Sequence, residues 1–357
     1  MVAQLYPVVM AGGSGTRFWP YSRKNKPKQF LAIGTEQPLL LETFNRLDAL
    51  APWENRYVVA GEVHADPILN LCPNMPKNQL LIEPCPRNTA PCVALAALHL
   101  YERDPNGIML VLPSDHHISE LAHFQKAIKS AMLGASENKI ITLGIKPTRP
   151  ETGYGYIQYP GGGVLNESRL SVKRFVEKPP FEVAKEYLES GEYLWNSGVF
   201  FFTPALILSE IQRQMPDLYQ ALEVIRPTIN TPTYETTLNH VFAQLKSVSI
   251  DVGIMEGAKN IEVIPVDMGW NDVGHWAALE DFAPKDPNGN VIEHEKHFLI
   301  DASQNIVQSD SFVALIGVSN LIVVQTPDAV LVCPKDRSQD VRLVVEWLKK
   351  HKKEELI

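Results

Sequence analysis

Short apolar runs alternate with stretches of helical periodicity along most of this chain. Four runs are short, rich in branched side chains and bounded by turn residues, which is typical of buried strands. They are residues 6–11, 56–60, 107–112 and 139–145. Residues 38–50 and 89–103 carry apolar side chains at spacings of three and four, which predicts helices. This alternation predicts an α/β fold with a doubly wound, mixed but mostly parallel sheet of Rossmann-like type.

A third helix is predicted to follow Ser119, whose hydroxyl is a favourable helix cap, and to end near Gly134. Its inward face is expected to consist of Leu121, Phe124, Ala127, Ile128, Ala131 and Met132. Sheets of this kind bind ligands beyond the carboxyl ends of their strands. Polar residues directly after the predicted strands are therefore the first candidates for a site.

The pattern changes after the segment DFAPKDPNGN, residues 281–290. Short apolar clusters then recur at steps of about six to eight residues, with few helix formers before residues 341–353. The clusters centre on Leu299, Ile306, Val313, Ile322 and Val330. We expect a catalytic domain over residues 1–283 and a small β-rich domain over residues 284–357, similar to a left-handed β-helix and closed by a helix.

Composition excludes several classes of protein. Among 357 residues, 45% are hydrophobic and 21% are charged, so a sizeable core is expected. The net charge of −8 argues against a nucleic-acid partner. The four cysteines lack the spacing of a zinc site or a disulfide framework, which suits a reducing compartment. Because the chain has neither a membrane-length apolar run nor a basic leader, we expect a cytoplasmic protein with no membrane partner.

A glycine-rich turn follows the first predicted strand, in AGGSGTRFWPYSRKNKPKQFL, residues 11–31. Bare backbone N–H groups at residues 12–15 can approach a phosphate chain that a β-carbon would hold away. The turn matches neither of two known phosphate loops. No Gly-Lys-Ser/Thr follows it, and Phe18 stands where the dinucleotide pattern needs glycine.

Five cations and no acid follow this turn within twelve residues: Arg17, Arg23, Lys24, Lys26 and Lys28. A polyanion is the natural partner of such a cluster, although an ordinary turn with a solvated basic face is the alternative. Prolines at 20 and 27 and a tryptophan at 19 stiffen the segment. Because stiffening fixes the directions of Arg17 and Lys28, it favours the polyanion.

Two aspartates follow predicted strands and are candidate ligands for the divalent metal that a triphosphate site generally needs. Asp115 lies in LVLPSDHH and Asp272 in DMGWNDVGHW, after the apolar run 261–266. Hard oxygen ligands from two strands, completed by phosphate and water, suit Mg²⁺. Each aspartate alone could instead cap a turn or a helix. His116 and His117 are expected to pack or to form hydrogen bonds, not to bind zinc.

These segments resemble the motifs of sugar-1-phosphate nucleotidyltransferases. The Trp-Pro and Pro-Lys-Gln-Phe-Leu parts of the first are similar to the mannose-1-phosphate guanylyltransferase branch. Seven further motifs match in the same order, so that the resemblance covers nearly the whole chain. They are EPCPRNTAP (83–91), LPSDHHI (112–118), ETGYGYI (151–157), FVEKP (175–179), WNSGVFFF (195–202), SID (249–251) and GWNDVGHW (269–276).

The resemblance implies Mg²⁺-assisted transfer of GMP from GTP to mannose 1-phosphate, which gives GDP-mannose and pyrophosphate. Arg17 and Lys28 would hold the triphosphate and stabilise the leaving pyrophosphate, and Asp115 and Asp272 would hold Mg²⁺. Lys178 would bind the sugar phosphate. Such a reaction asks a protein for positioning and charge stabilisation, with no covalent intermediate.

The resemblance also implies residues that recognise the base and the sugar. Glu83 would accept hydrogen bonds from guanine, and Glu177 and Asn196 would bind mannose hydroxyls. Alternatively, Glu177 and Lys178 are an exposed pair, and the residues at 88 and 89 cap a helix. The implied substrate-binding set is Gly12, Gly13, Ser14, Gly15, Thr16, Glu83, Arg87, Asn88, Thr89, Ser114, Gly155, Glu177, Lys178 and Asn196.

One position departs from the family pattern. Where the family commonly has Met-Glu-Lys after SID, this chain reads VGIMEGAKN, with Gly257 in place of the lysine and Lys259 two residues later. We therefore leave that position out of the site. An isomerase domain, as in bifunctional members, is not expected, and a homodimer is expected from analogy alone.

Two other functions stay open. One is the same chemistry with a different base or sugar. The other is a noncatalytic nucleotide-sugar sensor of the same fold, which loss of Arg17, Lys28, Asp115 or Asp272 would indicate. All four are present.

Overall fold

Two groups of segments make up the structure, a computed structural model that describes residues 3–13, 15–161, 168–292 and 297–357. The first unit comprises residues 1–12, 46–113 and 118–270. The second comprises residues 13–45, 114–117 and 271–357. The glycine turn from residue 13, the basic segment and Asp115 thus belong to the unit that contains the C-terminal segment. The domain boundary expected after residue 283 stays a prediction.

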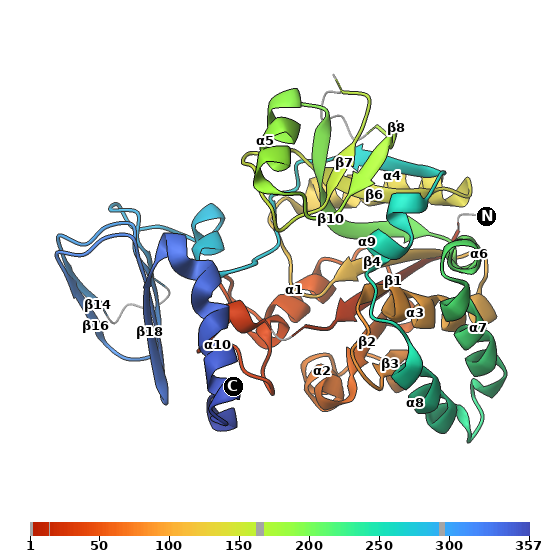
Figure 1. Ribbon diagram of the computed structural model, residues 1–357, viewed down its shortest axis with the longest axis horizontal. Coiled ribbons are helices and arrows are strands. Elements are labelled where there is room, and N and C mark those ends of the chain that lie inside the picture. The colour runs from red at the N-terminus through yellow and green to blue at the C-terminus, as the bar shows by residue number, and fades with distance from the viewer. Residues whose placement is uncertain (1–2, 14, 162–167, 293–296) are drawn as a thin grey trace. The chain divides into compact units, whose positions relative to one another are not determined.

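A ten-stranded mixed sheet forms the first unit (Figure 1). Its main path runs β3-β2-β1-β4-β10-β6-β11-β8, and off this path β7 pairs with β10 and β9 pairs with β7. The strands are β1 (Leu5–Ala11), β2 (Tyr57–Gly61), β3 (Leu80–Glu83), β4 (Ile108–Pro113), β6 (Ile140–Ile145), β7 (Tyr156–Gln158), β8 (Leu170–Ser171), β9 (Arg174–Val176), β10 (Tyr193–Phe202) and β11 (Ile261–Pro265). Strands β3, β2, β1 and β4 are parallel, and β10 is antiparallel to β4 and β6. The predicted α/β fold is confirmed.

Helices connect these strands and cover the sheet (Figure 1). Those of the first unit are α2 (Ala65–Leu71), α3 (Thr89–Arg103), α4 (Leu121–Ser136), α5 (Phe181–Ser190), α6 (Pro204–Gln214), α7 (Pro216–Ile225), α8 (Tyr234–Gln244) and α9 (Ile250–Gly253). The helix predicted over residues 89–103 is α3 to the residue. It is so rich in small side chains that every position from 90 to 98 is buried.

Two helix predictions need correction. Helix α1 (Leu39–Asn45) ends well before Leu50, because the chain tightens into a turn in which Leu50 N donates to Leu47 O, ahead of the helix-disfavouring Pro52. Ser119 does not cap α4. The capping position is Glu120, without a side-chain hydrogen bond, and Ser119 N pairs with Gly269 O instead.

The inward face of α4 is mostly as predicted. Phe124, Ala127, Ile128 and Ala131 are buried. Leu121 is 43% exposed. It occupies the first helical position, from which a side chain points back past the helix end and away from the sheet.

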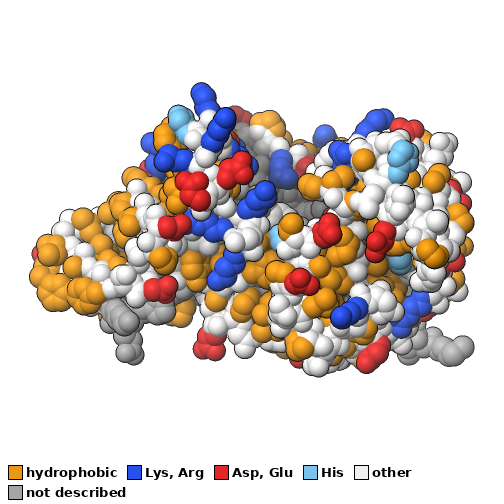
Figure 2. All heavy atoms as spheres, turned by 90° about the horizontal axis from the view of Figure 1, so that it is seen from below, with side chains coloured by type: hydrophobic (Ala, Val, Ile, Leu, Met, Phe, Trp, Pro, Cys, Tyr) orange, Lys and Arg blue, Asp and Glu red, His pale blue; other side chains and the backbone are white. Residues whose placement is uncertain are grey.

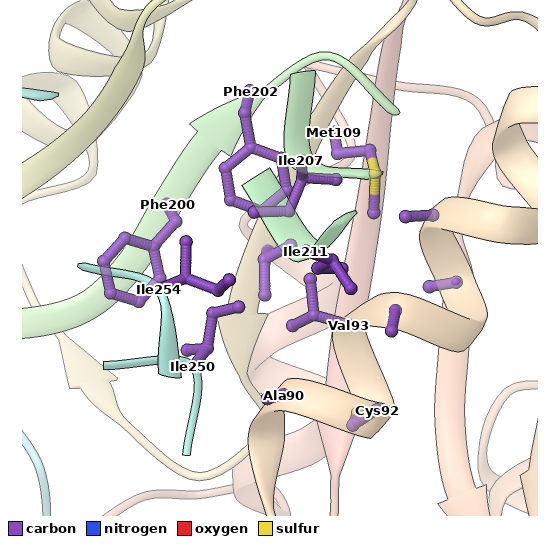
Figure 3. Packing of buried hydrophobic residues seen from close by; sticks show 14 of the residues in the cluster. Ala90, Cys92, Val93, Met109, Phe200, Phe202, Ile207, Ile211, Ile250 and Ile254 are labelled. Carbon is purple, nitrogen blue, oxygen red and sulfur yellow. The ribbon is translucent and has the colours of Figure 1, made fainter. Parts of the chain in front are cut away.

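The core of the first unit lies where α3, α6 and α9 meet strand β10 (Figure 3). Phe200 and Phe202 from β10 and Ile207 and Ile211 from α6 surround the small residues of α3. The short helix α9 contributes Ile250, and Ile254 follows directly after it; both are buried. Because interiors of this kind are close-packed, α9 holds a defined position although it is only four residues long.

The second unit combines the basic segment with a β-helix-like coil. Strands β13, β15 and β17 are parallel, as are β14 and β16, and β18 turns back antiparallel to β17. Their bounds, with that of the closing helix, are β13 (Val291–Ile292), β14 (His297–Ile300), β15 (Ile306–Ser309), β16 (Val313–Ile316), β17 (Leu321–Thr326), β18 (Ala329–Pro334) and α10 (Val341–Lys350). Phe18 and Trp19 of the basic segment share one core with Ile322 and Trp276. The expected β-helix-like architecture is confirmed.

An asparagine ladder runs along this coil. Asn305 Nδ2 donates to Asn290 Oδ1 at 3.0 Å, and Leu321 N donates to Asn305 Oδ1 at 3.0 Å. Asn290 and Asn305 are buried, 15 residues apart. The sequence carries this repeat as Asn followed by two branched residues at 290, 305 and 320, a signal that a search for apolar spacing missed.

All four cysteines are free thiols. Within the described ranges, no helix has both the length and the apolar character that a membrane crossing requires.

Candidate functional site

The positions of the glycine turn differ in how much free space surrounds the backbone. A Cβ added at Gly12 or Gly13 would meet no atom within 4 Å, so the backbone there is accessible. At Gly15, which has φ +57°, a Cβ would lie 2.5 Å from the Cβ of Lys28. Glycine is therefore required at 15 by its left-handed conformation and by the close approach of Lys28. Ser14 lies outside the described residues, and Thr16 begins a short 3₁₀ helix (Thr16–Phe18).

Lys28 joins the two predicted metal ligands within the second unit. Its side chain is buried, and Nζ lies 3.0 Å from Asp115 Oδ2 and donates to the Asp272 carbonyl at 2.7 Å. Burial alone would raise the pKa of Asp115, but the Lys28 ammonium and His116 outweigh it and hold that pKa below its ordinary value. Asp115 is therefore a carboxylate at neutral pH.

The backbone beside Asp272 is strained. Val273 has φ +46°, an outlier for a β-branched residue. It is held there by burial of its side chain and by a 2.7 Å bond from its N to Asn271 Oδ1. A Cβ at Gly274 would lie 2.7 Å from Asp272 Oδ2, so glycine leaves room for the carboxylate. Strain that the surroundings maintain in this way is a reason to assign function to Asp272.

The donor set of these residues fits Mg²⁺. Asp115 and Asp272 supply hard carboxylate oxygens, and no group of three or more His, Cys, Asp or Glu side chains suited to a metal exists in the part of the chain described. The remaining ligands would then be phosphate and water, as Mg²⁺ prefers. Ser114 Oγ is buried without a hydrogen-bond partner among the described residues. His117 stacks on the ring of Phe282 at 4.3 Å, which agrees with a packing role.

The cations that precede Lys28 have different environments. Arg17 is exposed, with Nη1 donating to Gln339 Oε1 at 3.2 Å. Arg23 is committed to structure, because it pairs with Asp328 at 2.6 Å and donates to the carbonyl of residue 356. Lys24 and Lys26 are exposed, as a solvated basic face would be. The expectation that all five cations face one polyanion is therefore too broad.

Glu83 ends strand β3 in the first unit with a buried carboxyl group. Its side chain is 9% exposed, and Oε1 has no hydrogen-bond partner among the described residues. Burial raises its pKa to about 7. Because buried polar atoms are nearly always paired, this unpartnered oxygen is a candidate to accept a hydrogen bond from a ligand.

The residues after Glu83 form the start of α3. Asn88, at φ +67°, is its N-cap and accepts from Thr89 N at 2.8 Å, so the capping interpretation is right for Asn88. Thr89 Oγ1 accepts from Ile250 N at 2.8 Å. Arg87 donates to the carbonyls of residues 242 and 243 at the end of α8. These hydrogen bonds are all within the protein, whereas the buried Oε1 of Glu83 has no partner among the described residues.

The predicted sugar residues meet where β7 begins, where β9 ends and within β10. Lys178 Nζ lies 2.5 Å from Glu177 Oε1, and Lys178 is mostly exposed with a left-handed backbone at φ +45°. Asn196 N donates to Gly155 O at 2.8 Å. A Cβ at Gly155 would lie 2.8 Å from Glu177 Oε2 and 3.3 Å from Asn196 Cβ. The structure therefore brings all four residues together.

Two carboxylates that the sequence interpretation left out lie against this group. Asn196 Nδ2 donates to Asp251 Oδ1 at 2.9 Å, and Glu177 N donates to Glu256 Oε1 at 3.3 Å. Burial and the Glu177 carboxylate raise the pKa of Asp251 to about 6. Asp251 belongs to the SID motif, residues 249–251, but no role was assigned to it from the sequence.

The position that departs from the family pattern lies beside Gln214. A Cβ at Gly257 would be 2.1 Å from Gln214 Oε1, and Gln214 Nε2 donates to Ile254 O at 3.1 Å. Lys259 is exposed ahead of β11. Gln214 therefore occupies the space that a side chain at position 257 would need.

Two family models match the chain. The model described as "Nucleotidyl transferase" matches residues 6–289. The model described as "MannoseP isomerase/GMP-like beta-helix domain" matches residues 295–348.

Curated relatives match nearly the whole chain. A mannose-1-phosphate guanylyltransferase from Salmonella muenchen is 41% identical over 99% of this chain and 75% of its own length. One from Klebsiella pneumoniae is 41% identical over 98% of this chain and 75% of its own length.

Solved structures also match. A protein from Thermus thermophilus, titled a mannose-1-phosphate geranyltransferase, has a TM-score of 0.88 at 36% identity and covers 97% of this chain and 99% of its own. A mannose-6-phosphate isomerase from Helicobacter pylori has a TM-score of 0.60 at 27% identity, over 74% of this chain and 99% of its own.

Proposed function

The chain belongs to the nucleotidyl transferase family, in the branch of the mannose-1-phosphate guanylyltransferases, and on that premise we propose that it transfers GMP from GTP to mannose 1-phosphate. The products are GDP-mannose and pyrophosphate. The family is the one predicted from the eight sequence motifs, and that prediction is confirmed. The observation that carries the proposal is Lys28, whose buried ammonium joins Asp115 and the Asp272 backbone in one cluster.

The phosphates of GTP are held by the second unit. Lys28 and Arg17 bind the triphosphate and stabilise the pyrophosphate as it leaves, while Gly13 offers an open backbone N–H group. Asp115 and Asp272 hold Mg²⁺, which when bound neutralises charge that develops on the phosphate oxygens. In support of these roles, Asp115 is ionised, Lys28 is fixed by burial, and Asp272 sits next to a strained backbone.

Glu83 selects the base. Its carboxylate accepts hydrogen bonds from guanine N1–H and the 2-amino group, whereas adenine has an acceptor at N1 and no amino group at C2. The support is the buried, unpartnered Oε1 of Glu83. Because a site built to accept these donors leaves a buried carboxylate unpaired with the wrong base, it discriminates strongly.

The sugar phosphate is bound by the residues before β7, after β9 and within β10. Lys178 binds its phosphate, and Glu177, Asn196 and the Gly155 backbone bind its hydroxyls. A phosphate oxygen of mannose 1-phosphate attacks the α-phosphorus of GTP in line. The bond between that phosphorus and the β-bridging oxygen breaks, and both electrons leave with pyrophosphate.

A substrate matrix tests this function. Each nucleoside triphosphate is mixed with mannose 1-phosphate or glucose 1-phosphate, with and without Mg²⁺, and pyrophosphate release is measured. We expect GTP with mannose 1-phosphate and Mg²⁺ to be fastest. A faster alternative pair would assign a different base or sugar, and release from no pair would favour a nucleotide-sugar sensor. K28M should lose turnover, and K26M, on the exposed Lys26, is its matched control.

We also propose that two copies associate through the β14 and β16 face, in the cytoplasm. Large apolar side chains lie exposed on these paired strands, where Ile300 is in register with Ile316. Figure 2 shows hydrophobic side chains gathered on this unit, at the left of the view. Light scattering should give a dimer for the wild type and a monomer for I316E. L133E, on the exposed Leu133 of α4, is the control.

A further inference from the structure

The side-chain amide of Asn196 is held at both ends. Its Nδ2 donates to Asp251 Oδ1 at 2.9 Å, and its Oδ1 accepts from Gly198 N at 3.0 Å. We propose that Asp251 is a positioning residue for sugar recognition, which fixes the orientation of the Asn196 amide toward the sugar hydroxyls. This inference rests on the proposed function and assigns a role that no motif match had given to Asp251.

The two partners of Asn196 together allow one orientation of its amide. A carboxylate only accepts hydrogen bonds, and a backbone N–H only donates. Turning the amide over would place its oxygen against Asp251 and its NH₂ against the Gly198 N–H. Because Oδ1 also accepts from Thr142 Oγ1 at 3.4 Å, Asn196 with Asp251 present offers its second Nδ2–H to a ligand. Without Asp251, the donor end loses its only partner among the described residues.

The protonation of Asp251 suits this task. Its pKa of about 6, raised by burial and by the neighbouring Glu177 carboxylate, leaves it ionised above neutral pH. It is then an acceptor alone. The nearby Lys178 ammonium acts in the opposite direction and lowers the pKa of Asp251.

Asp251 is held on a rigid element. Ser249 caps helix α9 by accepting from Val252 N at 3.3 Å, and Ile250 and Ile254 on either side of Asp251 are buried against α3 and β10 (Figure 3). Ile250 N donates to Thr89 Oγ1. A side chain on such an element can hold its partner more exactly than one on a free loop. Because the backbone N–H of Ile250 donates the hydrogen bond to Thr89, changes to the Asp251 side chain leave that bond in place.

Steady-state kinetics on two variants test the role. D251A should raise the KM for mannose 1-phosphate about tenfold, the size expected when one hydrogen bond from Asn196 to the sugar is lost, with the KM for GTP unchanged. D251N keeps an acceptor oxygen and should restore most of the affinity. D217A, on the exposed Asp217, is the matched control, and urea unfolding midpoints verify that all variants fold.

A double-mutant cycle separates positioning from direct contact. If Asp251 acts through Asn196, the N196A/D251A enzyme should have the same KM for sugar phosphate as N196A alone. Additive effects would overturn the positioning role. A normal KM in D251A, or equal increases for sugar phosphate and GTP, would also overturn it.

The reference sugar phosphate is whichever the wild-type enzyme turns over fastest in the substrate matrix. If glucose 1-phosphate proves faster, the proposed sugar is wrong, and the role of Asp251 is still measured with that substrate. If no pair reacts, the proposed function is wrong, and the role of Asp251 is decided separately. Calorimetric binding of mannose 1-phosphate to wild type and D251A then decides the inference, and equal affinities, or no binding to either, overturn it.

Discussion

The buried carboxyl group of Glu83 should lower the free energy of unfolding of the ligand-free protein. A neutral side chain of the same shape should restore that free energy. The folded pKa of about 7 lies above the ordinary 4.5, because burial disfavours the carboxylate. A raised acidic pKa means that the folded state binds more protons than the unfolded state between these two values. Stability contributed by the protonated group is therefore present below about pH 4.5 and lost as the pH rises through about 7.

The magnitude follows from the two pKa values. At 1.36 kcal/mol per pKa unit, the difference between 4.5 and about 7 corresponds to ~3 kcal/mol of lost stability at alkaline pH. At about pH 5 less than ~1 kcal/mol of this loss has occurred. E83Q cannot ionise, so its advantage over the wild type should widen by ~2 kcal/mol between about pH 5 and about pH 8.

Urea unfolding of wild type and E83Q at both pH values measures this difference. Other groups with perturbed pKa values, such as Asp251, titrate in both proteins and cancel in the comparison. E186Q, on the exposed Glu186 of α5, is the control and should show no pH-dependent gain. A gap between E83Q and wild type that stays constant with pH would refute the reasoning, because the Glu83 carboxylate would then be solvated in the folded state.

The same substitution should harm nucleotide binding. An amide in place of the carboxylate loses a charged acceptor for guanine, and the KM for GTP should rise about tenfold to a hundredfold, with less change for mannose 1-phosphate. Greater stability together with weaker GTP binding would indicate that Glu83 is kept for the base. An unchanged KM for GTP in a stabilised E83Q would remove Glu83 from the base site and leave the stability argument intact.

Three further outcomes follow from the site. D115N and D272N should each lower turnover at least about a hundredfold while the circular dichroism spectrum stays native, and near-normal turnover in either would remove that residue from the metal site. K178A should raise the KM for mannose 1-phosphate far more than that for GTP, and equal effects on both substrates would contradict its assignment. G155A places a methyl group 2.8 Å from Glu177 Oε2 and should weaken sugar phosphate binding, whereas G61A, whose nearest contact would be at 4.0 Å, should not.

Local periodicity was enough to predict much of the fold. The strands β1, β2, β4 and β6 and the helix α3 are found where apolar runs and helical spacing predicted them. Buried positions recur at short intervals along a strand or a helix face, so the sequence alone shows where they fall. The coil of the second unit was predicted only in outline. Its asparagine ladder repeats every 15 residues, beyond the window in which apolar spacing is read.

The candidate site was predicted as a set of residues, but their partners were not. Lys28 and Arg23 are both cations of one short segment, and nothing local distinguishes them. Lys28 meets a residue 244 positions away, whereas Arg23 meets one 305 positions away. A side chain's charge is determined by its own chemistry. Whether it binds a ligand or a structural partner depends on which distant segment the fold places against it.

The sequence by itself determined the family, the alternation of strands and helices, and the charged residues available for chemistry, because each is written in residue types and short spacings. Only the tertiary structure decided that one Glu83 oxygen is buried with no partner in the part of the chain described, and that Asp251 holds the amide of Asn196 from 55 positions away. Burial and hydrogen-bond geometry depend on contacts between segments that are remote in the chain, and no local pattern specifies those contacts.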